Sequence, residues 1–409
     1  MAAGRRLLCI YQHAPTPGAP GIYRHRLYLA ELARRGWAVD LVSTPINYML
    51  GTRPDRYARA PYVREVIDDV VHHWVWASAN VHRTRGHRAM NYATFAAAAA
   101  IRGATLPRPD VIWASSPPLP IGSVGELLAA RFRRPWVLEV RDLWPESAVS
   151  VGWLDADSGL YRALDRVARH YARHAGAALV PTPGLAEPVR RQGADVVAVV
   201  PGAVFDSSRP AETRTRMRAV LGIADETCLF VYVGALGVAN GLQTLLDAAA
   251  EVADDGTMAF VVVGDGSDRR RLESEIERRR IPAIRILPPA PKEEIPDLLA
   301  AADVCLHLLR PDPLFTGALP AKTLEYLGAH RPFITTVPGV PETLALASSG
   351  GFAPSRDALV RELRRWSAMS ADERRRRGEE AFRYGITNFS LAANVDRLEG
   401  VLVGATRSA

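Results

Sequence analysis

The sequence predicts an α/β protein made of two doubly wound domains that face each other across a cleft. Three observations support this prediction. The chain has 409 residues, which is enough for two separate hydrophobic cores. Short apolar runs alternate with helical stretches in both halves, a pattern typical of parallel sheets covered by helices. Between the halves, Val200–Pro210 contains turn residues and lacks periodicity, which indicates a linker.

Short apolar runs predict the strands of the first domain. A loop rich in glycine and proline, with Gly18 and Gly21, follows the first of them. It lacks the G-x-G-x-x-G fingerprint of a dinucleotide site, but its glycines would let the backbone approach a ligand. The predicted strands are Leu7–Tyr11, Ala38–Val42, His72–Trp76, Asp110–Ala114, Trp136–Val140 and Ala178–Pro181, and the predicted helices are Tyr23–Arg34 and two that start at Ile121 and Gly184.

Composition narrows the class of protein. No apolar run reaches about 18 residues, the N-terminus does not resemble a cleaved signal, and all three cysteines lie in apolar runs. These features predict a cytoplasmic protein with reduced cysteines and without a membrane-spanning helix. The net charge of +7 favours anionic partners such as nucleotides or phospholipid surfaces. Nucleic acid is disfavoured as a partner, because the arginines are spread along the predicted helices.

A basic helical stretch is predicted over Ala79–Arg102. Its first part carries Arg83, Arg85, His87 and Arg88, and its second part is rich in alanine. Such a stretch could lie on an anionic membrane surface, which would make the protein peripheral at the inner face of the membrane. It could equally be a partly exposed helix that covers the sheet.

Polar residues follow several predicted strands of the first domain. Ser116 follows one strand, Arg141 and Asp142 follow the next, and His13 lies just after the first. Because ligands bind at the carboxyl ends of strands in open α/β sheets, these residues are candidates for a binding site. As alternatives, Arg141 and Asp142 could pair with each other or cap a helix. His13 could be a structural histidine instead of an acid–base or acceptor-binding group.

The second half repeats the strand–loop–helix pattern. The loops after its first two strands carry Gly237, Gly264 and Gly266. The predicted strands are Cys228–Val233, Ala259–Val263, Ile284–Leu287, Val304–Leu309 and Pro332–Thr336; the predicted helices are Leu242–Ala253, a charged helix that ends at Arg280, Pro291–Ala301, two that start at Pro320 and Pro341, Arg356–Trp366, Ala371–Tyr384 and Leu391–Val403.

The helix that starts at Pro320 carries the strongest candidate for chemistry. Lys322 lies in its first turn and Glu325 one turn later on the same face. A cation at the positive end of a helix is mildly unfavourable unless an anion lies between them. Only two of the 51 basic residues are lysines, Lys292 and Lys322. We therefore expect a diphosphate at Lys322 and a ribose at Glu325, although an ordinary exposed Lys–Glu pair is the alternative.

Three motifs, taken together, resemble the retaining nucleotide-sugar glycosyltransferases of family four, which have the GT-B fold. The resemblance extends over nearly the whole chain, and the Arg141–Glu146 segment (RDLWPE) resembles a subgroup that builds bacterial surface polysaccharides and includes amino-sugar transferases. The motifs are Tyr232–Gly237 (YVGALG) followed by Asn240–Leu242 (NGL), Val263–Gly266 (VGDG), and Pro320–Gly328 (PAKTLEYLG) followed by Arg331 and Pro332.

The resemblance implies that the two domains bind different substrates. Residues 1–205 would bind the acceptor, residues 206–385 would bind the nucleotide sugar, and a helix in 386–409 would pack back toward the first domain. The donor side would comprise Gly237, Gly264, Gly266, Gly317, Ala318, Leu319, Lys322 and Glu325, and the acceptor side Gly18, Gly21, Ser116, Arg141 and Asp142. Lys322, Asp142 and His13 are the catalytic candidates, with Lys322 neutralising the departing phosphate.

The resemblance also implies a reaction and its partners. A hexosyl or N-acetylhexosaminyl group would pass from a nucleotide diphosphate, with uridine as the expected base, to an acceptor hydroxyl with retention of configuration. In this family the diphosphate is thought to help deprotonate the attacking hydroxyl on the front face. The acceptor would be a lipid-linked glycan or a small natural product. No cofactor or metal is expected, and we interpret the D-x-D sequence at Asp155 and Asp157 as helix capping.

Two departures from the family pattern leave other functions open. The family commonly has Glu-x7-Glu, but Gly317 stands eight positions before Glu325. The loop after Val233 lacks the usual Arg and Lys, so Arg310 is a possible substitute cation, although a structural salt bridge is an equal alternative for this residue. A sugar-nucleotide epimerase on the same fold, or a catalytically silent subunit that only binds nucleotide sugar, are therefore the alternatives.

Overall fold

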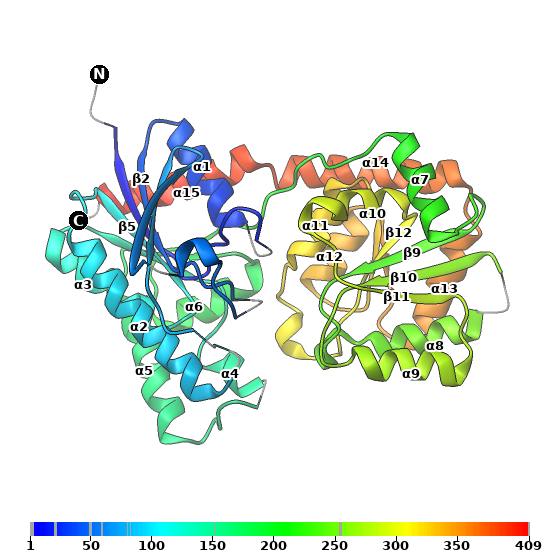
Figure 1. The fold of residues 1–409 in the computed structure, drawn as a ribbon, viewed down its shortest axis with the longest axis horizontal. Helices are drawn as coiled ribbons and strands as arrows, with labels where there is room; N and C mark the ends of the chain where they lie inside the picture. Colours follow the sequence, from blue (N-terminus) through cyan, green and yellow to red (C-terminus); the bar gives the residue numbers. More distant parts are fainter. Residues whose placement is uncertain are drawn as a thin grey trace. The chain divides into compact units, whose positions relative to one another are not determined.

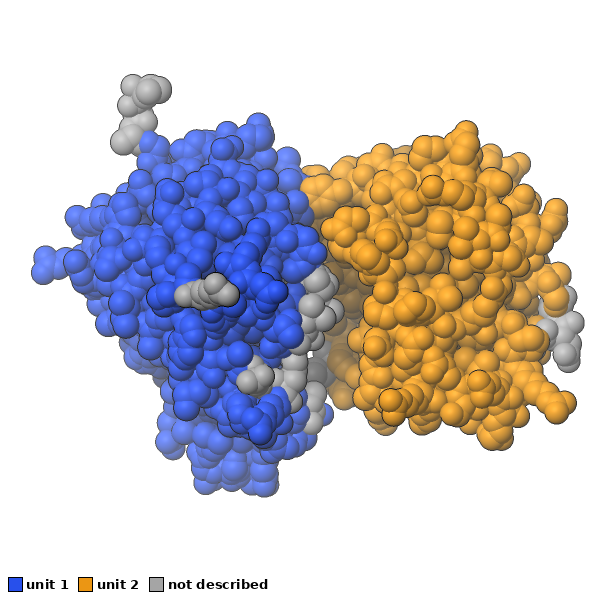
Figure 2. All heavy atoms as spheres, in the orientation of Figure 1, with its two compact units in different colours: residues 1–201, 391–409 blue, residues 202–390 orange. Residues whose placement is uncertain are grey.

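The computed structural model describes residues 4–19, 23–48, 51–58, 60–79, 81, 83–150, 152–252 and 256–407. The chain divides into two compact units (Figures 1 and 2). Unit 1 contains Met1–Pro201 and Leu391–Ala409, and unit 2 contains Gly202–Ser390. Each unit is a Rossmann-like α/β domain with its own sheet, as expected for the GT-B fold.

The sheet of unit 1 has eight strands in the order β3-β4-β2-β1-β5-β6-β7-β8. All neighbouring strands are parallel except β3 and β4, which form an antiparallel hairpin at one edge. The strands are β1 (Arg6–Ile10), β2 (Ala38–Ser43), β3 (Tyr62–Ile67), β4 (Val70–Val75), β5 (Val111–Ser116), β6 (Trp136–Val140), β7 (Ala177–Val180) and β8 (Val197–Val199).

Helices cover both faces of this sheet, as Figure 1 shows. One face packs against α2, α3, α5 and α6, and the other against α1 and α15. The C-terminal helix α15 therefore completes unit 1. The helices are α1 (Arg24–Arg34), α2 (Arg85–Ala104), α3 (Pro120–Phe132), α4 (Glu146–Ser150), α5 (Gly159–His174), α6 (Ala186–Gln192) and α15 (Leu391–Arg407), with short 3₁₀ turns η1 (Asp55–Tyr57) and η2 (Pro183–Leu185).

The basic helix α2 is shorter than predicted. It begins at Arg85 and not at Ala79, because the Thr84 side chain caps it by accepting a hydrogen bond from the His87 backbone N–H. Its buried face, which includes Phe95 and Ala99, packs against the sheet. Within the part of the chain that the structure describes, no helix is both long and apolar enough to span a membrane.

The sheet of unit 2 has six parallel strands in the order β11-β10-β9-β12-β13-β14. Alternate residues of each strand face opposite layers. In β9, for example, Phe230 packs toward α8, α9 and α13, whereas Val231 packs toward α10, α11 and α14. The strands are β9 (Cys228–Val233), β10 (Met258–Val263), β11 (Ile284–Leu287), β12 (Val304–His307), β13 (Phe333–Thr335) and β14 (Gly351–Phe352).

The connections of unit 2 supply the helices that surround its sheet. They are α7 (Ala211–Leu221), η3 (Val238–Asn240), α8 (Leu242–Val252), α9 (Arg269–Arg279), η5 (Lys292–Glu294), α10 (Ile295–Ala301), η6 (Pro313–Phe315), α11 (Ala321–Gly328), α12 (Val340–Ala347), α13 (Arg356–Ser367) and α14 (Ala371–Asn388). Because every strand is parallel, the loops after β9, β10, β11 and β12 all emerge at one edge of the sheet.

Candidate active site

The topology of each sheet identifies where a ligand can bind. In unit 2, β10 and β12 lie on opposite sides of β9, so the chain turns in opposite directions after β9 and β12. In unit 1, β2 and β5 flank β1 in the same way. Crevices at such switch points are the usual ligand sites of open α/β sheets. The loops after β1, β5, β9 and β12 are those in which the sequence places most of the candidate residues.

The Lys322 side chain lies at the switch point of unit 2. It extends from the first turn of α11 to the end of β9, where its Nζ atom is 4.2 Å from the centre of the Tyr232 ring. The ammonium donates a hydrogen bond to the Tyr232 hydroxyl over 3.0 Å. Gly234 makes room for it, since a Cβ atom there would lie 2.6 Å from Nζ. Tyr232 thus positions Lys322, a role that the sequence did not reveal.

The Lys322 ammonium lacks a carboxylate partner among the described residues. Desolvation lowers its pKa to about 8, and the charge of Glu325 opposes this only in part. His307, at the end of β12, adds no negative charge; burial and the nearby lysine lower its pKa to about 3, so this histidine is neutral. A desolvated cation of this kind gains free energy when an anion binds beside it.

Two glycine loops lie against each other beside Lys322. The Leu236 N–H donates to the Asp265 carbonyl over 2.9 Å, and the Asp268 N–H donates to the Leu236 carbonyl over 2.9 Å. This backbone contact leaves no room for a side chain at Gly264 or Gly266. A Cβ atom on Gly264 would lie 1.9 Å from the Gly234 carbonyl oxygen, and one on Gly266 would lie 2.5 Å from that of Leu236. Gly264 and Gly266 are therefore required for the loop geometry.

Substitution of Gly264 by alanine should disturb this loop pair. The residue has φ of +152° and its new Cβ would clash with backbone, so we expect a loss of about 2–3 kcal/mol in unfolding free energy. Gly256→Ala is a matched control, because Gly256 also has positive φ (+67°) but a Cβ atom there would have no other atom within 4 Å. Urea denaturation of both variants measures their unfolding free energies. Equal losses of unfolding free energy in the two variants would contradict the prediction.

Hydrogen bonds link Gly237 to Lys322 through the side chains of Asn240 and Tyr232. Its carbonyl accepts a hydrogen bond from the Asn240 N–H, and the Asn240 Oδ1 atom lies 3.0 Å from the Tyr232 hydroxyl. Arg310, the suggested substitute cation, has its N–H bonded to the Ala239 carbonyl over 2.9 Å. The Arg310 side chain is exposed, and no ion pair engages it in the described part of the chain. A cation is therefore available beside the Gly237 loop.

The segment with Gly317, Ala318 and Leu319 leads directly into α11. The Val340 N–H holds it by donating to the Thr316 carbonyl over 2.8 Å. This approach requires Gly339, where a Cβ atom would lie 2.4 Å from that oxygen. No side chain caps the start of α11, and its first turn has no acidic residue. The helix N-terminus can therefore offer backbone N–H groups to an anion.

Glu325 has a partner that the sequence did not predict. Its carboxylate forms an ion pair through Oε1 with Lys292, the other lysine of the chain, which lies in η5. Both side chains are well exposed to solvent, so the pair contributes little to stability. The second carboxylate oxygen, Oε2, can accept hydrogen bonds from hydroxyl groups of a ligand. The scarcity of lysine was the one signal in the sequence that could have suggested Lys292.

The predicted residues after β1 lie in an aromatic environment. His13 lies near three tyrosines, the nearest being Tyr48 with ring centres 4.6 Å apart. Burial, assisted by Arg141, lowers the pKa of His13 to about 3. A histidine with so low a pKa is a weak base near neutral pH, so the environment favours contact with an acceptor over proton transfer. Gly18 has φ of +77° in an exposed turn, and Gly21 lies outside the described residues.

The residues after β5 and β6 approach one another. The Arg141 N–H donates to the Ser116 carbonyl over 2.8 Å, and the Arg141 guanidinium donates to the Pro117 carbonyl and lies over the Tyr11 ring. Ser116 and Asp142 both line one small pocket. Desolvation by the surrounding protein raises the pKa of the Asp142 carboxyl group, and the charge of Arg141 opposes this shift. No ion pair joins Arg141 to Asp142 among the described residues.

A buried charge network lies beneath this edge of unit 1. Glu139, fully buried in β6, forms an ion pair with Arg24. The His25 Nε2–H group donates a hydrogen bond to the same carboxylate over 2.6 Å, and burial lowers the pKa of His25 to about 4, so this histidine is neutral near pH 7. The His25 ring stacks on Tyr11, with ring centres 3.8 Å apart. Arg24 also donates to the carbonyls of Val200 and Pro201. The network holds α1, and the chain at Val200 and Pro201, against the sheet. The sequence pattern did not predict this network.

The D-x-D sequence belongs to a turn before α5. The Asp155 carboxylate accepts a hydrogen bond from the Asp157 N–H over 2.9 Å. The cap itself is the next residue, Ser158, which accepts from the Tyr161 N–H over 3.0 Å. Helix capping was therefore predicted in the right segment but at the wrong residue, since Ser158 and not Asp155 or Asp157 caps α5.

Comparison with protein families identifies the two units. Residues 18–203 match the glycosyl transferase 4-like domain, and residues 227–368 match the glycosyl transferases group 1 domain. Among solved structures, sucrose-phosphate synthase from Thermosynechococcus elongatus superimposes with a TM-score of 0.76 at 17% identity, covering 99% of this chain and 100% of that one. Anabaena HepE in complex with UDP-glucose has a TM-score of 0.70 at 15% identity, covering 97% and 99%. The fold is thus that of the GT-B glycosyltransferases.

Curated proteins with similar sequences are also glycosyltransferases. Alpha-D-kanosaminyltransferase of Streptomyces kanamyceticus is 27% identical over 57% of this chain and 61% of its own length. A putative colanic acid biosynthesis glycosyl transferase of Escherichia coli is 25% identical over 31% and 30%. The matches thus span about three fifths or less of these relatives. Two segments of the chain, residues 18–203 and 227–368, therefore each resemble a glycosyl transferase domain.

Proposed function

We propose that this protein is a retaining glycosyltransferase that moves a sugar from a nucleotide diphosphate to an acceptor hydroxyl. The observation that carries the proposal is the Lys322 ammonium, which is desolvated and without a carboxylate partner among the described residues. It lies beside two glycine loops and in the first turn of a helix without a side-chain cap. These are the elements that bind a diphosphate in other proteins.

The donor is proposed to bind entirely on unit 2. Lys322 and the Gly237 loop would hold the diphosphate, with Arg310 as a second cation. Gly264 and Gly266 would flank the nucleoside, and Glu325 would accept hydrogen bonds from ribose hydroxyls. The UDP-glucose complex of HepE, which shares the fold, supports uridine as the base. Gly317, Ala318 and Leu319 would contact the sugar through the backbone, because no glutamate is present at position 317.

The acceptor is proposed to bind at the edge of unit 1 formed by Gly18, Gly21, Ser116, Arg141 and Asp142. His13 would contact it through its ring, and the Asp142 carboxylate would accept a hydrogen bond from an acceptor hydroxyl. The diphosphate of the donor would deprotonate that hydroxyl on the front face, without a metal ion. The relatives named for kanosamine transfer and for colanic acid biosynthesis support a natural product or a surface glycan as acceptor, and an amino sugar as donor.

Incubation with a panel of nucleotide sugars tests the proposal. Release of free nucleotide together with a glycosylated acceptor of retained configuration is the expected result, measured by mass spectrometry and NMR. An epimerised sugar nucleotide would instead identify an epimerase. Binding of the nucleotide sugar without any turnover across acceptors of both classes would identify a silent partner subunit, an alternative that the glycine at position 317 keeps open.

The affinity for UDP should fall as the pH rises above 8. The pKa of Lys322 is about 8 in the free protein, and a bound diphosphate favours the protonated amine. Binding above pH 8 must therefore take up a proton, so Kd should increase by up to about ten-fold per pH unit. Calorimetric titration between pH 7 and 9.5 measures this. In Lys322→Met the dependence should vanish; an equally steep dependence in that variant would contradict the assignment to Lys322.

A further inference from the structure

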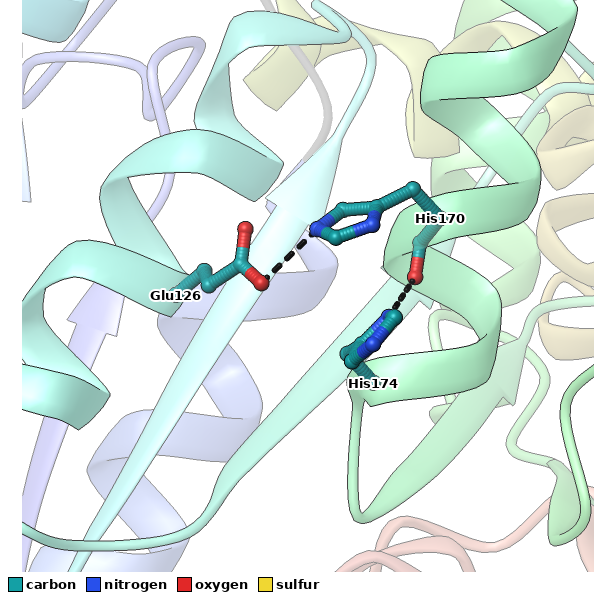
Figure 3. Close-up of side chains that lie close together, drawn as sticks. All are labelled: Glu126, His170 and His174. Carbon is teal, nitrogen blue, oxygen red and sulfur yellow. Dashed lines mark hydrogen bonds and ion pairs between the residues drawn. The ribbon is translucent and has the colours of Figure 1, made fainter.

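A second cluster of chemically active side chains lies in unit 1, outside the proposed donor and acceptor residues. Glu126 projects from α3, and His170 and His174 project from α5 (Figure 3). One ligand atom from each of the three lies within 4.8 Å of the others. We propose that this cluster binds a divalent transition-metal ion such as Zn²⁺ and that the bound ion links α3 to α5.

The residue types and their spacing suit such an ion. His170 and His174 are four positions apart on one helix, so they share a face, and their ring centres are 4.2 Å apart. The His170 Nε2 atom is 2.9 Å from the Glu126 Oε1 atom. Two ligands of one tetrahedral zinc ion, each about 2.0–2.1 Å from the metal, lie about 3.3 Å apart. Small adjustments of the side chains would therefore admit the ion.

The hydrogen bond of the His174 ring leaves its Nε2 atom available to a metal ion. Its Nδ1–H donates to the His170 carbonyl oxygen over 2.7 Å. The Nε2 atom of the neutral ring therefore has a free lone pair. Histidines that bind metals usually donate their other ring N–H to a carbonyl or carboxylate in this way. The Trp136 indole N–H donates to the His174 carbonyl over 3.1 Å and fixes the end of α5.

Close packing of the two helices fixes the distance between the ligands. A Cβ atom on Gly122 of α3 would lie 2.3 Å from the ring of Tyr171, so the absence of a side chain allows this ring to rest on α3. Gly122 is one turn before Glu126, and Tyr171 is next to His170. The Tyr171 hydroxyl is also hydrogen-bonded to the Ser123 side chain. The ligands thus project from a rigid framework.

The cluster has a simpler explanation that an experiment must exclude. His170 and Glu126 could form an ordinary exposed ion pair, and His174 could stabilise the carboxyl end of α5. Arg173 in the same last turn adds positive charge, which would weaken binding of a cation. With two neutral imidazoles and one carboxylate, the site should therefore bind reversibly and prefer Zn²⁺, Ni²⁺ or Co²⁺ to Mg²⁺ or Ca²⁺.

The ion would affect the pocket that Ser116 and Asp142 line. Ala168 and Tyr171 of α5 form another part of the lining, and α3 begins four residues after Ser116. An ion that holds α3 against α5 would therefore hold the walls of this pocket in place. The binding of metal itself does not depend on the proposed transfer reaction, and its test does not use activity.

Titration of the chelator-treated protein with Co²⁺ and Zn²⁺ tests the site. We expect one equivalent of Co²⁺ to give a visible absorption band that Zn²⁺ abolishes, and Zn²⁺ to raise the Tm. His174→Ala, His170→Gln and Glu126→Gln should each weaken binding at least about ten-fold and remove the Tm shift. His87→Ala, which alters a histidine on α2, should leave the metal affinity and the Tm shift unchanged.

Two results would overturn the proposal. One is binding that the three cluster variants and His87→Ala weaken equally, since this would show unspecific attachment to exposed histidines. The other is the absence of both the absorption band and the Tm shift at millimolar metal. Because the three side chains lie near the surface, the variants should keep the circular dichroism spectrum and metal-free Tm of the wild type, which confirms that a loss of binding is local.

Discussion

Lys322→Met is expected to lower kcat/KM for the nucleotide-sugar donor by about 10²–10³-fold, the usual cost of removing one group that stabilises developing negative charge. Methionine keeps the apolar stem against Tyr232 but removes the ammonium that lies 3.0 Å from the tyrosine hydroxyl. The departing diphosphate then lacks its closest cation in the proposed site. Steady-state kinetics with donor varied, and calorimetry with UDP, measure the effect.

The chain offers a matched control for this substitution. Lys292→Met removes the only other lysine, which is exposed and pairs with Glu325. It should change kcat/KM no more than a few-fold, because an exposed ion pair contributes little and Glu325 stays in place. The unfolding free energy of Lys322→Met should not fall, since the variant no longer buries a charge. Full transfer activity in Lys322→Met would refute the role proposed for this lysine.

Glu139→Gln is expected to lower the stability of unit 1 by about 3–5 kcal/mol, because it leaves buried Arg24 without its counter-charge. Burial alone would raise the pKa of the Glu139 carboxyl group, but Arg24, His25 and Arg141 hold it well below the usual range. Since the folded pKa of Glu139 is lowered, its ion pair with Arg24 and its hydrogen bond with His25 stabilise the fold above the unfolded pKa of the carboxyl group. This stabilisation is lost progressively as the pH falls below that value.

Urea denaturation monitored by tryptophan fluorescence measures this loss at neutral pH and again at about pH 4. The wild type should approach the variant at the lower pH, because protonation of Glu139 then begins to contribute to unfolding. Glu187→Gln makes the same chemical change at an exposed position in unit 1 and should cost less than about 0.5 kcal/mol. A Glu139→Gln variant as stable as Glu187→Gln would show that the network is not structural.

The buried parallel strands were predictable because burial on both faces leaves an uninterrupted apolar run. Cys228–Val233 is an example, and it has the predicted bounds to the residue. Two strands with a charged residue in the run also have the predicted bounds: Trp136–Val140, which contains Glu139, and the edge strand Ile284–Leu287, which contains exposed Arg285. Strand β3 was missed for the opposite reason. It is an edge strand with exposed charged residues such as Arg64, and it pairs antiparallel with β4 through a turn at Asp68 and Asp69. Arg64 and Glu65 interrupt its apolar residues, and no crossover helix joins it to its neighbour β4.

The candidate site was only partly predictable because its support comes from residues distant in the sequence. The glycine loops and Lys322 belong to compact motifs, so their position at the strand ends followed from the pattern. The partner of Lys322 is 90 residues away, and the partner of Glu325 is 33 residues away. Glu139 was hidden within a run of apolar residues. The D-x-D sequence indicated a helix after Asp157, but the extent of that helix was not predicted, so the spacing of His170 and His174 on α5 was not recognised.

The division of the chain has a consequence for its synthesis. Unit 2 is one continuous stretch, Gly202–Ser390, whereas unit 1 needs α15 from the far end of the chain. Helix α15 packs against α1, and its Glu399 accepts a hydrogen bond from the Trp37 indole N–H over 2.8 Å. On the ribosome, unit 2 can therefore complete its core while the first-made unit still exposes the surface that α15 will cover. The half of the protein that is translated first is the half that can finish folding last.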